Sequence, residues 1–164
     1  MSRIGGFVVA GVLAVGGIGA YEKWGKGGED NTVRGQTGEI VEQGDLGVFV
    51  MSIGDCFDAE AGEIATTIGI PCSSSHEKEY AAEYLLTTDV FPGRDALSSQ
   101  SEEQCLPLVS SYIGDLDNAV AKYPNLSWTS IVPTEVSFAA GDRKVSCVIG
   151  LSDGARLTES LRNF

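Results

Sequence analysis

The stretch that decides the fold opens with Gly54-Asp55-Cys56-Phe57 and closes with Pro71-Cys72-Ser73-Ser74-Ser75-His76-Glu77-Lys78-Glu79. Between these two ends lie an acidic, glycine-containing turn over 58–63 and a β-prone run over 64–70. A polar turn flanked by β-branched runs is typical of a hairpin. Because one cysteine stands near the outer end of each arm, the hairpin would bring Cys56 and Cys72 together.

Composition limits the size of the fold and the kind of partner. The chain has 164 residues, of which 43% are apolar, so we expect one folded domain with a modest core and an appendage. Lys and Arg number 11 against 23 Asp and Glu, which gives a net charge of −12. Such an acidic chain repels phosphate backbones, so we expect no nucleic acid as a partner. The charge fits either solubility alone or a cationic partner surface.

The N-terminal segment has the features of a membrane span. The 18 residues from Ile4 to Tyr21 include no charged side chain, and as a helix they would reach about 27 Å, enough for a thin bilayer. A cleaved signal peptide is the alternative, and we expect the anchor to be retained. Small residues recur every four positions at Gly6, Ala10 and Ala14, which predicts a face for close helix packing in lipid.

The rest of the chain predicts a linker and one domain. We expect a transmembrane anchor over 1–24, a flexible linker rich in Gly, Glu, Asp, Gln and Thr over 25–45, and an extracytoplasmic domain over 46–164. Strands are expected over 46–53, 64–70, 126–132 and 144–151, whereas 78–88 fits a strand or a helix. A short closing element is expected over 157–161.

Two helices complete the expected fold. Ser99 and Glu102 form a capping-box pattern ahead of a helix that Pro107 ends or kinks, and a second short helix is expected over 115–123. The predicted fold class is α+β, with a small antiparallel sheet packed by one or two helices.

The cysteines predict both covalent links and orientation. An even number behind an export segment implies disulfides, with three possible connectivities. We favour Cys56–Cys72, which closes the hairpin, and Cys105–Cys147, which ties a helix to the last strand. Since disulfides persist outside the cytoplasm, the expected topology is a single span with a cytoplasmic N-terminus and an extracytoplasmic domain in the cell membrane.

Cys72 and His76 also allow other hypotheses. Spaced i and i+4, with Cys56 nearby, they could ligate zinc, but the chain has a single histidine and no Cys-x-x-Cys pair. A catalytic thiolate–imidazole pair would need a free cysteine, which an exported even set argues against. We therefore expect no catalytic residue, metal or other cofactor. His76 is interpreted as a surface or turn histidine bonded to the backbone or to Glu79.

Six motifs follow one another along the chain in a distinctive order. They are Gly-Asp-Cys (54–56), Pro-Cys-Ser-Ser-Ser-His-Glu-Lys-Glu (71–79), Phe-Pro-Gly (91–93), Cys105, Gly-Asp-Arg-Lys-Val-Ser-Cys (141–147) and Leu-Thr-Glu-Ser-Leu (157–161). This order resembles the septum formation family of actinobacterial membrane-anchored proteins. The resemblance covers Gly54 to Leu161, with Ile70 where valine is usual and Glu159 where glycine is usual.

The resemblance implies a cell-envelope role but no defined activity. It places His76, Glu79, Asp142 and Arg143 at the polar motif positions of the family. From the residues alone, we expect Asp55 to bond a turn backbone, and Asp142 with Arg143 to do the same or to pair with Glu79.

The expected function follows from the anchor, the disulfides and the acidic domain. We expect a non-catalytic, single-pass accessory subunit of a larger cell-envelope membrane complex, whether septum-associated, respiratory or secretory. It would contact its partner complex through the transmembrane helix and the acidic domain, and the lipid bilayer through the helix. The alternatives are an extracytoplasmic ligand- or metal-binding domain, or a thiol-dependent enzyme that uses Cys72 and His76.

Overall fold

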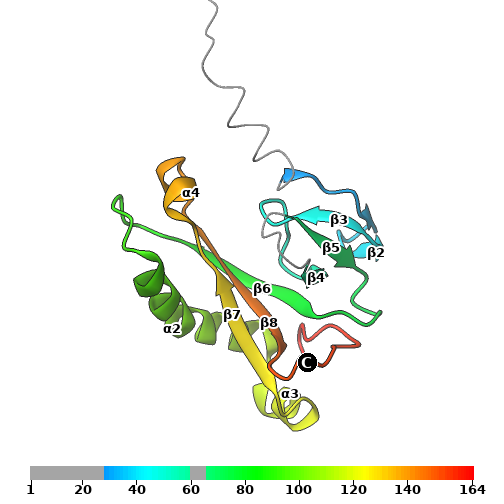
Figure 1. Ribbon diagram of the computed structural model, residues 1–164. Coiled ribbons are helices and arrows are strands. Elements are labelled where there is room, and N and C mark those ends of the chain that lie inside the picture. Colours follow the sequence, from blue (N-terminus) through cyan, green and yellow to red (C-terminus); the bar gives the residue numbers. More distant parts are fainter. Residues whose placement is uncertain (1–27, 60–65) are drawn as a thin grey trace, which may run out of the picture.

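The computed structural model describes residues 28–59 and 66–164. This part of the chain is an α+β domain built on a six-stranded antiparallel sheet with the strand order β3-β5-β4-β6-β8-β7 (Figure 1). A separate two-stranded ribbon, β1-β2, precedes it. The predicted α+β class with an antiparallel sheet is therefore confirmed.

The bounds of the elements are as follows. The strands are β1 (Val33–Arg34), β2 (Ile40–Glu42), β3 (Gly44–Gly47), β4 (Cys56–Ala59), β5 (Thr66–Ile70), β6 (Lys78–Leu85), β7 (Leu126–Ile131) and β8 (Lys144–Leu151). The helices are α2 (Arg94–Ile113), α3 (Leu116–Lys122) and α4 (Glu135–Ala139).

The core lies on both faces of the long central strands. Every residue of β8 after Lys144 is buried, as expected for a β-branched run with side chains packed on each face. One cluster joins the sheet to α2 and the C-terminal residues, and includes Val109, Ile149 and Leu161. The other cluster lies under the β3 and β4 half and includes Phe57 and Val148. The sheet thus joins two cores, and Figure 1 shows α2 along its β6-β8-β7 half.

The linker predicted over 25–45 differs from the structure over residues 28–45. This segment forms β1, β2 and the start of β3, and it packs on the domain. Ile40 is buried in a core cluster, and Asn31 N–H donates to Asp45 O at 2.8 Å. The segment is poor in large apolar residues, but one buried side chain together with backbone hydrogen bonds holds it in place. The domain therefore begins earlier than residue 46.

The first arm of the predicted hairpin is also corrected. β3 ends at Gly47, and a turn replaces the strand expected over 46–53 because Val48 and Met51 turn inward to the second core cluster. β5 lies between β3 and β4 and pairs with both. The partner across the predicted turn is β4, in a register that places Cys56 opposite Ile70. The hairpin is thus real, but its first arm starts at the cysteine.

The helix after the Phe-Pro-Gly turn begins before the predicted capping box. Gly93, with φ of 93°, precedes the first residue of α2, and Leu97 is fully buried. A positive φ costs glycine little, so the turn sets the start of the helix and Ser99 lies inside it. Pro107 lies within α2 without ending it. Buried contacts on both sides of the proline hold the helix together, including Cys105 and Val109.

Other predictions agree with the structure. The segment 78–88, which fitted a strand or a helix, forms a strand over 78–85. The strands predicted over 126–132 and 144–151 are found at 126–131 and 144–151, and α3 falls inside the helix predicted over 115–123. The expected closing element over 157–161 has no regular structure except a bridge at Leu157. Within 28–59 and 66–164, no helix combines the length and apolar character that a bilayer crossing requires. The predicted anchor over 1–24, with Gly6, Ala10 and Ala14, lies outside the described residues.

Candidate functional site

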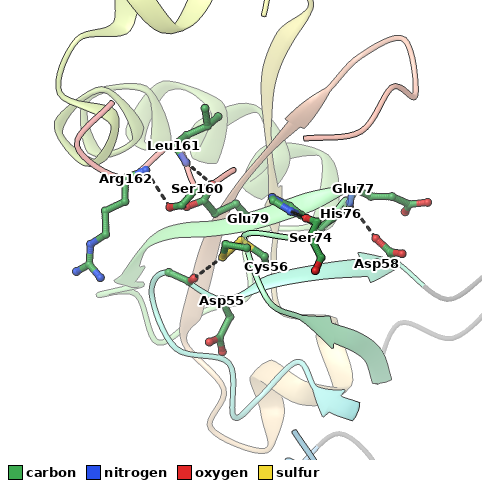
Figure 2. Close-up of a disulfide and its surroundings, with 12 residues drawn as sticks. Asp55, Cys56, Asp58, Ser74, His76, Glu77, Glu79, Ser160, Leu161 and Arg162 are labelled. Carbon is green, nitrogen blue, oxygen red and sulfur yellow. Dashed lines mark hydrogen bonds between the residues drawn. A yellow bond between two sulfur atoms is a disulfide. The ribbon is translucent and has the colours of Figure 1, made fainter. Parts of the chain in front are cut away.

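The domain contains two disulfides, and they are the two pairs that the sequence analysis favours. Cys56–Cys72 has a Cα–Cα distance of 5.2 Å and a sequence separation of 16. Cys105–Cys147 has a Cα–Cα distance of 5.5 Å and a separation of 42. No cysteine in the described ranges is free. Asp55, His76 and Glu79, three polar residues of the motifs, lie around the Cys56–Cys72 disulfide (Figure 2).

A buried carboxylate lies beside Cys56. Glu79 is directly opposite Cys56 in the β4–β6 register, and its side chain is fully buried. Glu79 Oε1 accepts from Tyr112 Oη at 2.5 Å and from Ser160 Oγ at 2.6 Å, and Oε2 accepts from Leu161 N–H at 2.8 Å. These donors offset the cost of removing the carboxylate from water. We call Glu79, Tyr112, Ser160 and Leu161 the C-terminal clasp.

The clasp fixes the end of the chain across the sheet. Figure 2 shows Ser160 and Leu161 beside Glu79 and the disulfide. Asn163 N–H also donates to Tyr112 O at 3.0 Å, so α2 holds the same segment through its backbone. Burial raises the pKa of Tyr112, and the negative charge and hydrogen bond of Glu79 raise it further. The Tyr112 hydroxyl therefore stays protonated and remains a donor.

His76 is buried rather than exposed. Its backbone forms a bridge with Leu157, with N–H···O distances of 3.0 and 2.9 Å. Its Nδ1 lies 2.8 Å from Ser74 O, and since a carbonyl only accepts, Nδ1 carries the proton. The surface interpretation is therefore wrong, and the interpretation of a bond to the backbone is confirmed. Nε2 is buried and has no hydrogen-bond partner in the part of the chain that the structure describes.

An exposed arginine ties the segment after β8 to the hairpin. Arg156 Nη2 donates to both carboxylate oxygens of Asp58, at 2.7 and 2.6 Å, and to Ser75 O at 2.8 Å. Its Nε donates to Ser75 Oγ at 2.8 Å. A guanidinium suits this role because its donors lie in a fixed plane. Arg156 thus binds the C-terminal segment to the hairpin at the solvent-exposed surface.

The aspartate of the Gly-Asp-Cys motif holds the N-terminal segment. Asp55 is buried, and Ser52 N–H donates to its Oδ2 at 2.8 Å, which confirms the predicted bond to a turn backbone. Arg34 donates from Nη1 and Nη2 to the two oxygens of Asp55 at 2.7 and 2.9 Å. The hydrogen bond to Asp55 raises the pKa of Arg34. This pair could not be predicted from the sequence, because Arg34 lies in the segment that was interpreted as a linker.

The comparison with family models agrees with this arrangement of motifs. The model for septum formation matches residues 26–160, most of the chain. This protein belongs to the septum formation family. No curated protein and no solved structure matches the chain.

One motif of this septum formation domain lies away from the clasp. Asp142 Oδ1 accepts from Lys144 N–H at 3.1 Å, and Arg143 Nη1 donates to Phe138 O at 2.6 Å. The Arg143 guanidinium also lies 3.6 Å from the centre of the Phe138 ring. The predicted bond to a turn backbone is confirmed for Asp142. The alternative pairing with Glu79 is wrong, because within the described residues the Glu79 carboxylate accepts from the clasp donors, whereas Arg143 donates to Phe138 O and Asp142 O.

The septum formation domain also brings possible metal ligands together. Sulfur atoms of Cys56 and Cys72 and a carboxylate oxygen of Glu79 lie within 4.8 Å of one another. In a disulfide neither sulfur is a thiolate, which is the form that binds metals, and the Glu79 oxygens already accept three hydrogen bonds. The arrangement therefore serves the fold while the disulfide is intact.

Proposed function

We propose that this septum formation domain is the extracytoplasmic part of a non-catalytic, single-pass accessory subunit in a larger cell-envelope membrane complex. One observation carries the proposal: the buried polar residues at motif positions fix segments of their own chain. Glu79 holds the C-terminal segment, Asp55 holds the N-terminal segment, and His76 bridges to Leu157. Residues used in this way support a rigid surface for binding rather than a reaction centre.

The disulfides and the charge support the same proposal. Disulfides suit an oxidising compartment outside the cytoplasm, which supports an extracytoplasmic domain attached to an anchor over 4–21. A net charge of −12 favours a partner with a cationic surface and speeds association with it. The partner complex would also contact the anchor through Gly6, Ala10 and Ala14, since close approach of small residues drives helix association in lipid.

The experiment is co-purification of the full-length protein from membranes in mild detergent. Ala10→Leu places a large side chain on the small-residue face and should release the partner proteins while membrane retention stays intact. Val8→Leu places the same leucine side chain about 200° around the helix from Ala10 and serves as the control for position on the helix. Partners that co-purify equally well with Ala10→Leu would contradict the proposal, as would a mature N-terminus at Tyr21 or beyond.

A further inference from the structure

The two edge strands of the six-stranded sheet differ in how far other backbone segments cover them. The sheet ends at β3 on one side and at β7 on the other (Figure 1). Residues 29–31 cover the β3 edge: Asn31 N–H donates to Asp45 O at 2.8 Å, and Gly47 N–H donates to Glu29 O at 2.7 Å. Beyond a bond at Leu126, no backbone of residues 28–59 or 66–164 bonds the outer edge of β7. β7 is therefore the open edge of the described domain.

The alternation of hydrogen bonds along β7 identifies the backbone groups that face away from β8. Asn125 O, just before β7, accepts from Ser152 N–H at 2.9 Å, so Asn125 belongs to the set of residues that bond to β8. Residues of an antiparallel strand alternate between bonding to the neighbouring strand and facing away from it. The backbone N–H and C=O groups of Trp128 and Ser130 consequently face away from the sheet.

β7 lacks the features that protect an open edge. Its sequence, Leu-Ser-Trp-Thr-Ser-Ile, contains no charged residue and no proline, and it pairs with β8 without a register shift. Natural proteins prevent pairing of exposed edges with lysines, prolines or bulges. Thr129 in the middle of the strand is exposed. This edge is therefore suited to accept another strand.

We propose that β7 pairs antiparallel with β7 of a second copy of this chain, with Thr129 of one copy opposite Thr129 of the other. In this register each outward N–H of Trp128 meets the outward C=O of Ser130 in the second copy, and the reverse also holds. The two threonines form a cross-strand pair, which is a favourable combination. The pairing joins the two sheets into one continuous sheet.

The second copy fits because the edge is self-complementary. The register satisfies the outward N–H groups of both Trp128 and Ser130, and no like charges meet within 126–131. The chain as a whole carries a net charge of −12, so two copies repel each other at long range. Salt screens that repulsion, and the dimer should strengthen as the ionic strength rises. The inference is independent of the proposed accessory role, which concerns other partners.

The test is disulfide cross-linking of the full-length protein in mild detergent. Thr129→Cys places two thiols across a non-bonded pair, where Cα atoms are about 4.5 Å apart, within the range of a disulfide. Ser127→Cys is the matched control on the same face, because its two copies would lie about 13 Å apart in this register. Maleimide labelling of each variant corrects for thiol accessibility.

We expect Thr129→Cys to give about tenfold more cross-linked dimer than Ser127→Cys, because only the first pair meets disulfide geometry. Adding Ser130→Pro to Thr129→Cys removes an outward N–H and leaves the β8 ladder intact, since proline is tolerated at an edge. This second change should abolish the cross-link. Equal cross-linking of Thr129→Cys and Ser127→Cys would overturn the proposal, and so would a cross-link that survives Ser130→Pro.

Discussion

The two disulfides lie in contrasting surroundings. Cys105–Cys147 joins α2 to β8 inside an apolar cluster, where both residues are fully buried. Cys56–Cys72 lies beside Glu79, whose carboxylate accepts hydrogen bonds from the C-terminal segment. Cys105–Cys147 holds a helix on the sheet, whereas Cys56–Cys72 lies where the hairpin meets the C-terminal segment. The contrast shows why Asp55, His76 and Glu79 gather around Cys56–Cys72: irregular segments need polar side chains to satisfy their backbone groups.

The largest effect is expected from removal of the disulfide between α2 and β8. Replacing Cys105 and Cys147 together by alanine should lower the free energy of unfolding by about 4 kcal/mol, because the bond closes a long loop in the unfolded chain. The sequence separation is 42 residues. Urea unfolding of the variant measures the loss. A loss under about 1 kcal/mol would show that the apolar cluster holds α2 without the covalent link.

A smaller loss is expected at the disulfide beside the clasp. Replacing Cys56 and Cys72 by alanine should cost about 3 kcal/mol in the same model, because the separation is only 16 residues. The same urea titration compares the two double variants directly. If this variant is the less stable one, loop length does not decide the order, and coupling between the disulfide and the clasp does.

The smallest effect on stability at neutral pH is expected at Tyr112. Tyr112→Phe removes one hydrogen bond to Glu79 and should cost about 1 kcal/mol at pH 7. Tyr84→Phe is the matched control: the Tyr84 hydroxyl is buried and has no partner among the described residues, so its removal should cost nothing. Equal losses for the two variants would contradict the hydrogen bond of the clasp.

The same tyrosine gives a pH dependence with a definite sign. The pKa of Tyr112 is raised in the folded protein above its ordinary value of 10.0, chiefly by burial. Above pH 10 the unfolded chain releases a proton that the folded protein keeps, so the stability falls as the pH rises. Unfolding measured from pH 8 to pH 11 should show a shallower fall for Tyr112→Phe than for the wild type. If the free energy of unfolding fell equally steeply with pH in Tyr112→Phe and in the wild type, Tyr112 would not cause the pH dependence.

Several features of the fold could be predicted from the sequence because their signals are local. Cysteine spacing and β-branched runs predicted the two disulfide pairs, the strand over 144–151 and the hairpin that contains Cys72. The order of motifs predicted the family. The strand and the hairpin depend on residues within one strand or turn, where periodicity and turn residues carry the information. The second disulfide links residues 42 positions apart, and it could be predicted because Cys56–Cys72 leaves a single pair among the four cysteines.

The rest depends on contacts between distant segments. Arg34 bonds to Asp55 over 21 positions, and Glu79 bonds to Leu161 over 82 positions. No local pattern marks such partners. The Tyr112 hydroxyl reaches Glu79, 33 positions away in the chain, only because α2 packs on β6. His76 was interpreted as exposed because a polar turn surrounds it, whereas the C-terminal segment covers it.

The central claim is that Glu79 holds the C-terminal segment, and hydrogen exchange of the Leu161 amide tests it most directly. Glu79→Leu keeps a similar side-chain volume and removes every acceptor of the clasp, whereas Glu83→Leu changes an exposed carboxylate on the same strand. In Glu79→Leu, the Leu161 amide should exchange at least about tenfold faster, while Val148 in β8 keeps its protection, because the tail opens locally. Exchange of Leu161 as slow in Glu79→Leu as in Glu83→Leu and the wild type would contradict the account.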